Sequence, residues 1–229
     1  AVGYAALYLN TTGAANTAVG GLGGSYTALN QNTTGSYNVA VGNGALGQNT
    51  TASNNTAVGY QASHSNTTGE GNASFGYFAL KSVTTGSYNA AFGNSTLRDN
   101  TSNGNSAFGY AALPVNTSGG SNTAMGFLTL ENNTTGSYHT ALGYQALNKN
   151  TTASYNTAVG YQSLFANTTG AQNTSVGVQS MVTNTTGANN TALGYGALAL
   201  NTTASYNTAV GYQALYAGTT TNDNTALGL

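Results

Sequence analysis

The sequence has no cysteine and no tryptophan, a single proline, and charged residues at only 3% of its 229 positions. The absence of cysteine excludes disulfides and cysteine-ligated metal centres. An average soluble protein is roughly 25% charged, so asparagine, threonine, serine, glutamine and tyrosine must provide the polar surface here. The formal net charge of -1 excludes the basic surface that would attract nucleic acid or an anionic membrane.

Long hydrophobic runs are also missing, and none approaches the roughly 18 residues needed to span a bilayer, so we expect no membrane segment in this sequence. Titratable groups are few, and none recurs at a repeat position. They comprise two histidines, three bases and four acids. No aspartate recurs as in calcium-binding repeats, and no glycine-rich stretch precedes the Lys-Ser/Thr pair of a phosphate loop. We therefore predict a protein that is not an enzyme and has no cofactor or metal.

What the sequence does contain is one repeat from end to end. The glycine that closes an A-V-G step serves as a ruler, and 11 of its 13 spacings are equal and give a period of 17. It falls at Gly3, Gly20, Gly42, Gly59, Gly76, Gly93, Gly109, Gly126, Gly143, Gly160, Gly177, Gly194, Gly211 and Gly228. The longer interval predicts an insertion at 21–25, and the shorter one a one-residue deletion near 100–105. We interpret 1–229 as a single array and, because it starts and stops mid-repeat, as a fragment of a longer one.

Two apolar columns recur in the consensus N-T-A-V-G-Y-Q-A-L-x-x-N-T-T-G-x-Y. One is leucine four positions after the glycine, with Ser63 as an exception. The other precedes the glycine, and we predict that it forms the core stripe. Its members are Val19, Val41, Val58, Phe75, Phe92, Phe108, Met125, Leu142, Val159, Val176, Leu193 and Val210.

A repeat of this period is too short for helical or leucine-rich repeats. Thr and Val alternate with small residues in N-T-A-V-G, which favours a short strand, and N-T-T-G carries turn residues. The sequence therefore predicts an all-β fold, a β-solenoid or β-roll of about 13 stacked 17-residue rungs. A coil this narrow has a thin core, so we expect self-association as a homo-oligomer. A parallel trimer and lateral packing in a filament both satisfy that expectation.

Two further columns suggest surface chemistry. Tyrosines after the glycine form a candidate binding ladder for sugars, with the alternative that they are a structural aromatic ladder. They are Tyr60, Tyr77, Tyr110, Tyr144, Tyr161, Tyr195 and Tyr212. Turn asparagines followed two residues later by Thr or Ser match the N-glycosylation pattern, although turn chemistry alone also explains them. They are Asn10, Asn32, Asn49, Asn66, Asn100, Asn116, Asn133, Asn150, Asn167, Asn184 and Asn201.

The repeat resembles known surface proteins. The steps Thr17 to Gly20, Ser106 to Gly109 and Thr140 to Gly143 are similar to the A-I-G repeats of trimeric autotransporter adhesin heads and to phage tail-fibre shafts. The resemblance covers the whole chain but is of low complexity, and the period of 17 differs from that of adhesin heads. It implies a left-handed, parallel, trimeric β-roll displayed outside a cell or virion.

The leading functional hypothesis is a structural segment of an extracellular fibre, filament or appendage at a cell or virion surface, whose partner is itself. The alternative is an adhesive module that binds glycans or another cell. A third hypothesis is ice binding, because a threonine pair such as Thr11 and Thr12 recurs once per repeat.

Overall fold

The structure is a computed structural model that describes residues 1–21, 26–217 and 220–228. Over these residues the chain is all-β, with thirteen three-residue parallel strands and no helix. Most rungs keep the period of 17 between equivalent residues, as between Asn32 and Asn49, which makes the fold a β-solenoid. The predicted fold class is therefore confirmed. The insertion expected at 21–25 lies outside the described residues except for Gly21.

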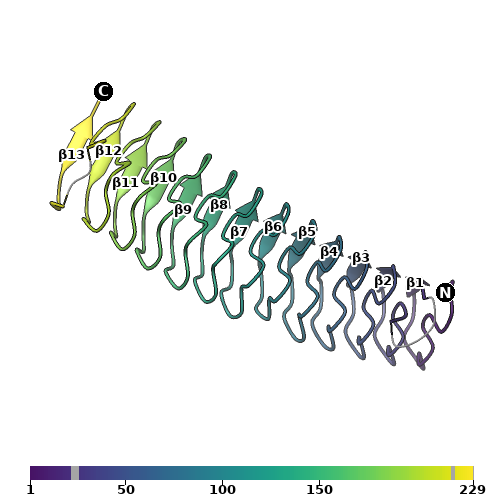
Figure 1. Cartoon of the computed structure of the whole chain (residues 1–229). Helices are drawn as coiled ribbons and strands as arrows, with labels where there is room; N and C mark the ends of the chain where they lie inside the picture. The colour runs from purple at the N-terminus through teal and green to yellow at the C-terminus, as the bar shows by residue number, and fades with distance from the viewer. Residues whose placement is uncertain (22–25, 218–219, 229) are drawn as a thin grey trace. The chain divides into compact units, whose positions relative to one another are not determined.

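The described residues form two compact units, Ala1–Ser118 and Gly119–Leu229. Within each unit, consecutive strands lie side by side in sequence order (Figure 1). The first unit holds β1 (Thr17–Val19), β2 (Val39–Val41), β3 (Thr56–Val58), β4 (Ala73–Phe75), β5 (Ala90–Phe92) and β6 (Ser106–Phe108). The second holds β7 (Thr123–Met125), β8 (Thr140–Leu142), β9 (Thr157–Val159), β10 (Thr174–Val176), β11 (Thr191–Leu193), β12 (Thr208–Val210) and β13 (Thr225–Leu227).

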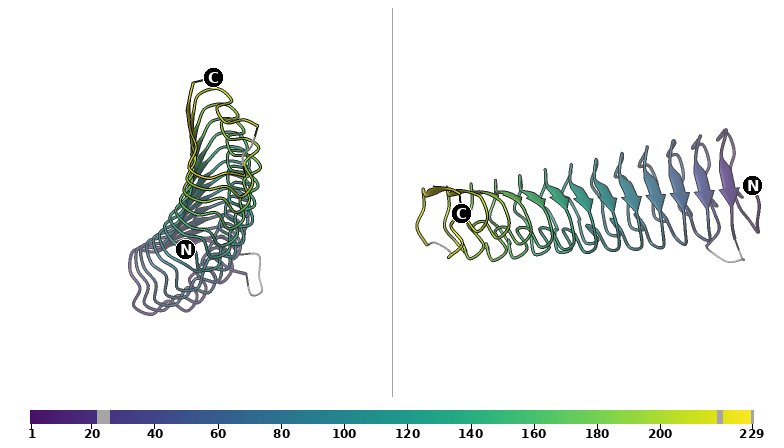
Figure 2. Two further views of the ribbon diagram at one scale, coloured as in Figure 1. Left: turned by 90° about the vertical axis from the view of Figure 1, so that its left-hand side faces the viewer. Right: turned by 90° about the horizontal axis from the view of Figure 1, so that it is seen from above.

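Equivalent residues of successive rungs lie opposite one another, as in the pairing of Ala141 with Ala158. Backbone pairing continues beyond the strands, because the Thr50 amide donates to the Thr67 carbonyl at 3.2 Å in the turn. Within each unit, Figure 2 shows the strands in one row and the turns following the same path in successive rungs. This one-to-one register explains why the sequence repeats so strictly, since each side chain has its own counterpart as a neighbour.

The ruler glycine occupies a place that no other residue fits. Gly143 has φ +132°, and a Cβ on it would lie 2.5 Å from the carbonyl oxygen of Gly160 in the next rung. Both the positive φ and the close backbone approach require glycine. The leucine four positions later also has positive φ, for example 51° at Leu80, so the coil uses left-handed residues even where the side chain is large.

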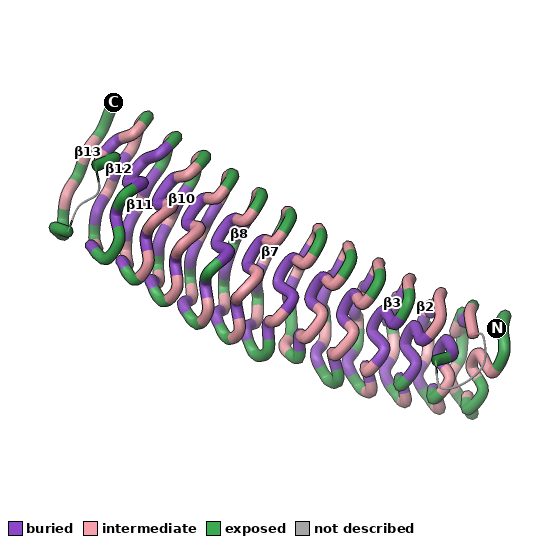
Figure 3. Tube along the Cα trace, viewed as in Figure 1, coloured by how far each residue is buried: buried purple, intermediate pink, exposed green. Residues whose placement is uncertain are grey.

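The core consists of alanine and leucine. Ala57, Ala62 and Leu46 belong to one cluster of fully buried side chains in the first unit. The leucine column after the glycine is thus internal, and the strand contributes its central alanine. Figure 3 shows the result, with buried segments alternating with exposed corners along each rung.

The predicted core stripe is wrong. Residues before the glycine are intermediate or exposed in every strand, and Val19, Val176 and Leu193 are 38%, 37% and 36% exposed. Side chains alternate along a strand, so when asparagine and alanine point inward, threonine and valine must point outward. The leucine from the other side of each narrow rung already fills the interior, which leaves space opposite it only for alanine.

The one-residue deletion is located in a turn of the first unit. Asn100 and Asn105 are five positions apart, whereas the equivalent Asn150 and Asn156 are six apart. The Asn100 amide accordingly donates to the carbonyl two residues on, at Ser102, at 2.9 Å. The shortened corner still keeps Asn105 in register, because its N–H donates to the Asn89 side chain at 2.9 Å.

Candidate functional site

The asparagines with the glycosylation pattern point into the coil. All except Asn10, at the N-terminal end, are fully buried. In a representative rung, Asn49 Nδ2 donates to the Asn32 side chain at 2.8 Å and to the Ala52 carbonyl at 3.0 Å. Both hydrogens of the nitrogen that would carry a glycan are therefore used inside the fold. The structure contradicts the glycosylation prediction at the ten buried asparagines, because an N-glycan cannot occupy the interior that these amides fill. We call this column, from Asn10 to Asn201, the turn ladder.

The turn ladder has one interruption. The residue at this position between Asn66 and Asn100 is Val83, which is fully buried. The Asn66 side-chain oxygen consequently has no hydrogen-bond partner in the structure. A buried acceptor without a donor is destabilising, by about 1–3 kcal/mol for a typical neutral group.

A second buried asparagine column lies four positions before the glycine. Its side chains link successive rungs: Asn38 accepts from the Asn55 backbone N–H at 3.0 Å and donates to the Ala52 carbonyl at 2.8 Å. We call it the strand ladder. Where both ladders are present, they hold the corner between turn and strand together by hydrogen bonds, which explains why asparagine recurs at both positions.

His139 takes the place of asparagine in the strand ladder. Its Nδ1 accepts from the Asn156 N–H at 3.2 Å, and its Nε2 lies 2.7 Å from the Ala153 carbonyl. A neutral imidazole protonated on Nε2 therefore reproduces the acceptor and donor of the amide it replaces. Burial lowers the pKa of His139 to about 4, which keeps the ring neutral at neutral pH.

The predicted tyrosine ladder is present on the surface. All seven tyrosines are exposed, and the structure stacks Tyr60 on Tyr77, Tyr144 on Tyr161 and Tyr195 on Tyr212 at centroid separations of 5.3–5.4 Å. Tyr144 also stacks on Phe127 at 5.4 Å. Rings stacked in this way cover one another's faces, whereas a sugar binds against an open face. A continuous part of the ladder therefore presents ring edges and hydroxyls and fits the structural alternative better.

The outer face of the strands was not recognised from the sequence. It carries the residues one and three positions before the glycine, and we use the term outer face for these two columns. In the first unit Phe92 stacks between Phe75 and Phe108, with centroids 4.7 Å apart on each side. In the second unit the outer face carries a threonine on every strand. The alternation in T-A-V was the sequence signal for this face. Assigning the alanine to the interior would have placed the threonine and the valine on the outside.

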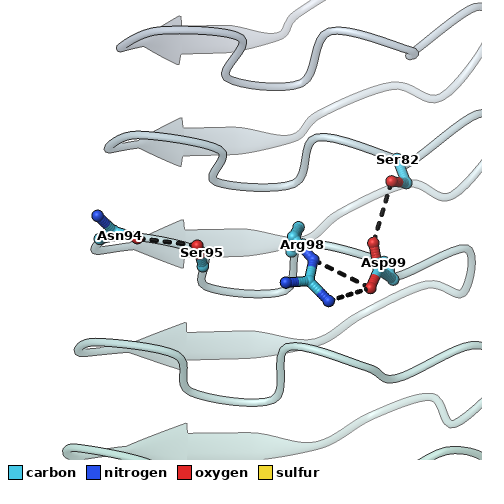
Figure 4. Close-up of polar contacts among 5 residues, drawn as sticks. All are labelled: Ser82, Asn94, Ser95, Arg98 and Asp99. Carbon is cyan, nitrogen blue, oxygen red and sulfur yellow. Dashed lines mark hydrogen bonds and ion pairs between the residues drawn. The ribbon is translucent and has the colours of Figure 1, made fainter.

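The charged residues of the described part of the chain include one ion pair on the surface of the first unit. Figure 4 shows this pair, in which Asp99 accepts from Ser82 at 3.2 Å and from Arg98 at 2.6 and 3.0 Å. The Ser95 hydroxyl donates separately to the Asn94 side chain at 2.8 Å. The hydrogen bond to Asp99 raises the pKa of Arg98 above its ordinary value. The ion pair is partly exposed, and such pairs contribute roughly 0–1 kcal/mol to stability.

Within the part of the chain that the structure describes, no three His, Cys, Asp or Glu side chains gather as a metal site. The same residues include no helix with the length and hydrophobicity needed to cross a membrane. A scan of protein-family models, a search of curated proteins and a search of solved structures each found no match for this chain.

Proposed function

We propose that the chain is a structural, self-assembling segment of an extracellular fibre, filament or appendage and performs no catalysis. The observation that supports this proposal is the pair of buried asparagine ladders, which link successive rungs in both units. Asn184, for example, donates to Asn167 at 3.0 Å and accepts from Asn201 at 2.7 Å. An inward-pointing amide that recurs on successive rungs makes a long, rigid coil. A catalyst needs instead a local cluster of reactive groups.

The outer face is the surface that we propose for self-association. Its apolar column is continuous from strand to strand within each unit, and Met125 is 41% exposed. Contiguous apolar surface of this kind marks interaction sites on soluble proteins. A second copy presents the same columns with the same spacing of about 4.8 Å between rungs, so the two surfaces match over many rungs at once. A trimer around a shared axis and lateral packing in a filament both use this face.

The placement outside a cell or virion rests on the resemblance to adhesin heads and tail-fibre shafts. Immunogold labelling of source cells tests it, with surface label expected. Label confined to the cell interior would contradict the placement.

Self-association is tested by sedimentation of the full chain over a range of concentrations, together with electron microscopy. Phe92→Lys puts a charge in the middle of the outer face and should weaken association by at least about tenfold, because it removes a central aromatic contact. Thr85→Lys adds the same charge at an exposed turn position and should associate like the parent. A parent chain that stays monomeric at every concentration, or a Phe92→Lys chain that assembles normally, would refute the role of this face.

Ice binding is a second candidate, favoured by one observation in the second unit. Seven successive strands each begin with an outward threonine, and each pairs in parallel with its neighbour. These are Thr123, Thr140, Thr157, Thr174, Thr191, Thr208 and Thr225. A regular row of hydroxyl and methyl groups beside an apolar row is suited to ordering water. The turn threonines are less suited, because the hydroxyl of Thr168, for example, donates to the Thr185 carbonyl at 3.1 Å.

Thermal hysteresis of the full chain tests ice binding. Thr174→Lys interrupts the outward row and should abolish the activity, whereas Thr186→Lys changes an exposed turn threonine and should leave it intact. Hysteresis equal to that of an unrelated protein, or activity that survives Thr174→Lys, would eliminate this candidate.

A further inference from the structure

A small cavity opens on one corner of the second unit, where three successive rungs meet the solvent. Its volume is about 180 Å³, below the roughly 300–1,000 Å³ of sites for drug-sized ligands, which suits a single ring rather than a chain. It is lined by Gln179, Val182, Tyr195, Gly196, Ala199, Leu200, Gln213 and Tyr216. These residues come from the positions just after the ruler glycine, so the cavity lies beside the tyrosine ladder.

The cavity exists because two side chains of the repeat are small in the same rung. Position 196 corresponds to the glutamine of the consensus, as in Gln179 and Gln213 of the rungs on either side, but Gly196 has no side chain. A Cβ there would meet Gln213 and Tyr216 only at ordinary contact distances of 3.4 Å. Ala199, three residues later, is also too small to fill the space.

The other glycine at this repeat position shows what a filled version looks like. At Gly44 the neighbouring His64 covers the gap, with its Nδ1 3.0 Å from the Gly44 carbonyl oxygen. His64 is only 9% exposed, so its ring is packed into the corner. At Gly196 the equivalent residue of the next rung is Tyr216, whose ring would lie 3.4 Å from a Cβ at Gly196. This ring is 43% exposed, so it fills the corner less completely than His64 does.

Two tyrosines give the cavity its apolar surfaces. Tyr195 stacks on Tyr212 on one side, but its other side has no aromatic neighbour in the ladder, because the equivalent residue of the preceding rung is Val178. This differs from Tyr144, which has rings on both faces. Tyr216 lies over Gly196 and is 43% exposed. The cavity is therefore lined by a tyrosine that stacks on another ring on one side only and by the exposed ring of Tyr216.

Two amides supply the polar groups. In an unbroken part of the glutamine column, Gln162 donates to Gln145 at 3.0 Å. The gap at Gly196 interrupts that column, and the side chains of Gln179 and Gln213 make no such contact across it among the described residues. The side-chain amides of Gln179 and Gln213 each have an NH₂ group that can donate hydrogen bonds to a ligand and an oxygen that can accept them. None of the lining residues is charged, so the cavity has no counter-ion for a phosphate, a carboxylate or an amine.

We propose that this cavity binds one neutral hexopyranose ring, as a free sugar or as the end of a glycan. A pyranose combines an apolar face, which packs on tyrosine, with hydroxyls that both donate to and accept from amides. The rings of Tyr195 and Tyr216 match the first requirement, and the amides of Gln179 and Gln213 match the second. This binding site is independent of the fibre proposal, since a segment that never assembles would still contain it.

The test is saturation-transfer NMR on the full chain with glucose, galactose, mannose and N-acetylglucosamine, and with glucose 6-phosphate as a charged probe. For a Kd on the order of 1 mM, sugar at about 50 mM would occupy nearly all of the sites. We expect saturation transfer from the protein to at least one neutral sugar and none to glucose 6-phosphate. The proposal would be overturned if no neutral sugar received saturation transfer, or if glucose 6-phosphate received as much as the neutral sugars.

Two variants localise the binding. Gly196→Gln restores the consensus side chain and fills the cavity, and the position tolerates it because Gln213 has a similar φ, 51° against 59°. Tyr216→Ala removes one ring. Each should weaken binding by roughly tenfold or more, as expected for a central aromatic or pocket-filling change. Tyr144→Ala removes a tyrosine that is also 43% exposed but lies away from the cavity, and should bind like the parent. Unchanged binding in Gly196→Gln, or stronger binding of an indole probe than of every sugar, would reject the site.

Discussion

Replacing Val83 with asparagine is expected to stabilise the first unit, even though it puts a polar side chain at a fully buried position. The new Nδ2 would donate to the unpartnered oxygen of Asn66 and to the carbonyl of Gly86, as Asn184 does to its own neighbours at 3.0 Å each. Its oxygen would accept from Asn100, which continues the turn ladder without a gap.

The expected size of the effect follows from three contributions. Satisfying the Asn66 oxygen recovers about 1–3 kcal/mol, and two further hydrogen bonds add about 1 kcal/mol each. Loss of the buried valine costs about 2 kcal/mol. The net gain is about 1–3 kcal/mol in the free energy of unfolding, which raises Tm by roughly 2–4 °C per kcal/mol in a chain of this length.

Thermal and denaturant unfolding followed by circular dichroism measures the gain, and hydrogen exchange locates it on the rungs around position 83. The matched control is Asn184→Val, which makes the reverse change in an intact part of the ladder and should lower stability by a similar amount. A Val83→Asn chain that is less stable than its parent, or an Asn184→Val chain that loses nothing, would refute the account of the ladder as a stabilising network.

Three further changes test other parts of the fold. Gly143→Ala should cost about 3 kcal/mol, because φ is +132° and the new Cβ meets the next rung; thermal unfolding measures it. His139 has a pKa of about 4 in the folded chain against an ordinary 6.5, so between these pH values the unfolded chain binds a proton that the folded chain does not. The free energy of unfolding should therefore be highest above pH 6.5 and fall by roughly 3 kcal/mol on acidification to pH 4. Unfolding curves recorded over a series of pH values measure this fall. Ser63→Leu combined with Ser74→Ala replaces two buried hydroxyls that bond each other at 2.9 Å with the consensus side chains and should raise Tm, since leucine burial contributes about 1.5–3 kcal/mol.

Each of these changes has a control. Gly196→Ala should be tolerated, because its φ of +59° is one that other residues adopt in this coil. His139→Asn restores the strand ladder and should remove the loss of stability between pH 6.5 and 4, and an unchanged pH profile would contradict the assignment. For the serine pair, Ser63→Leu alone should gain less than the double substitution, because it leaves the Ser74 hydroxyl without that partner.

Several features of the fold could be read from the repeat alone. Spacing between ruler glycines predicted the rung, and a buried leucine four positions after the glycine followed from its apolar column. These predictions succeeded because a solenoid places residue upon like residue, so that each structural requirement is repeated in the sequence once per rung.

The candidate sites were harder to predict. The Asn-x-Thr pattern is the same in an exposed turn and in a buried ladder, and only the hydrogen bonds of Asn49 to Asn32 and to the Ala52 carbonyl distinguish the two. The resemblance to adhesin heads and tail fibres, and the fibre function, stay predictions.

By itself the sequence determined the period, the all-β class and the positions at which each rung turns, because these depend on local backbone preference and on repetition. Tertiary structure decided which side of each strand faces inward. In T-A-V either the alanine or its two neighbours could be internal, and the sequence pattern is the same for both. The choice depends on the width of the coil: a rung this short that already encloses leucine has room for alanine but not for valine. That packing puts threonine and valine on the outer face and the asparagine amides inside the coil.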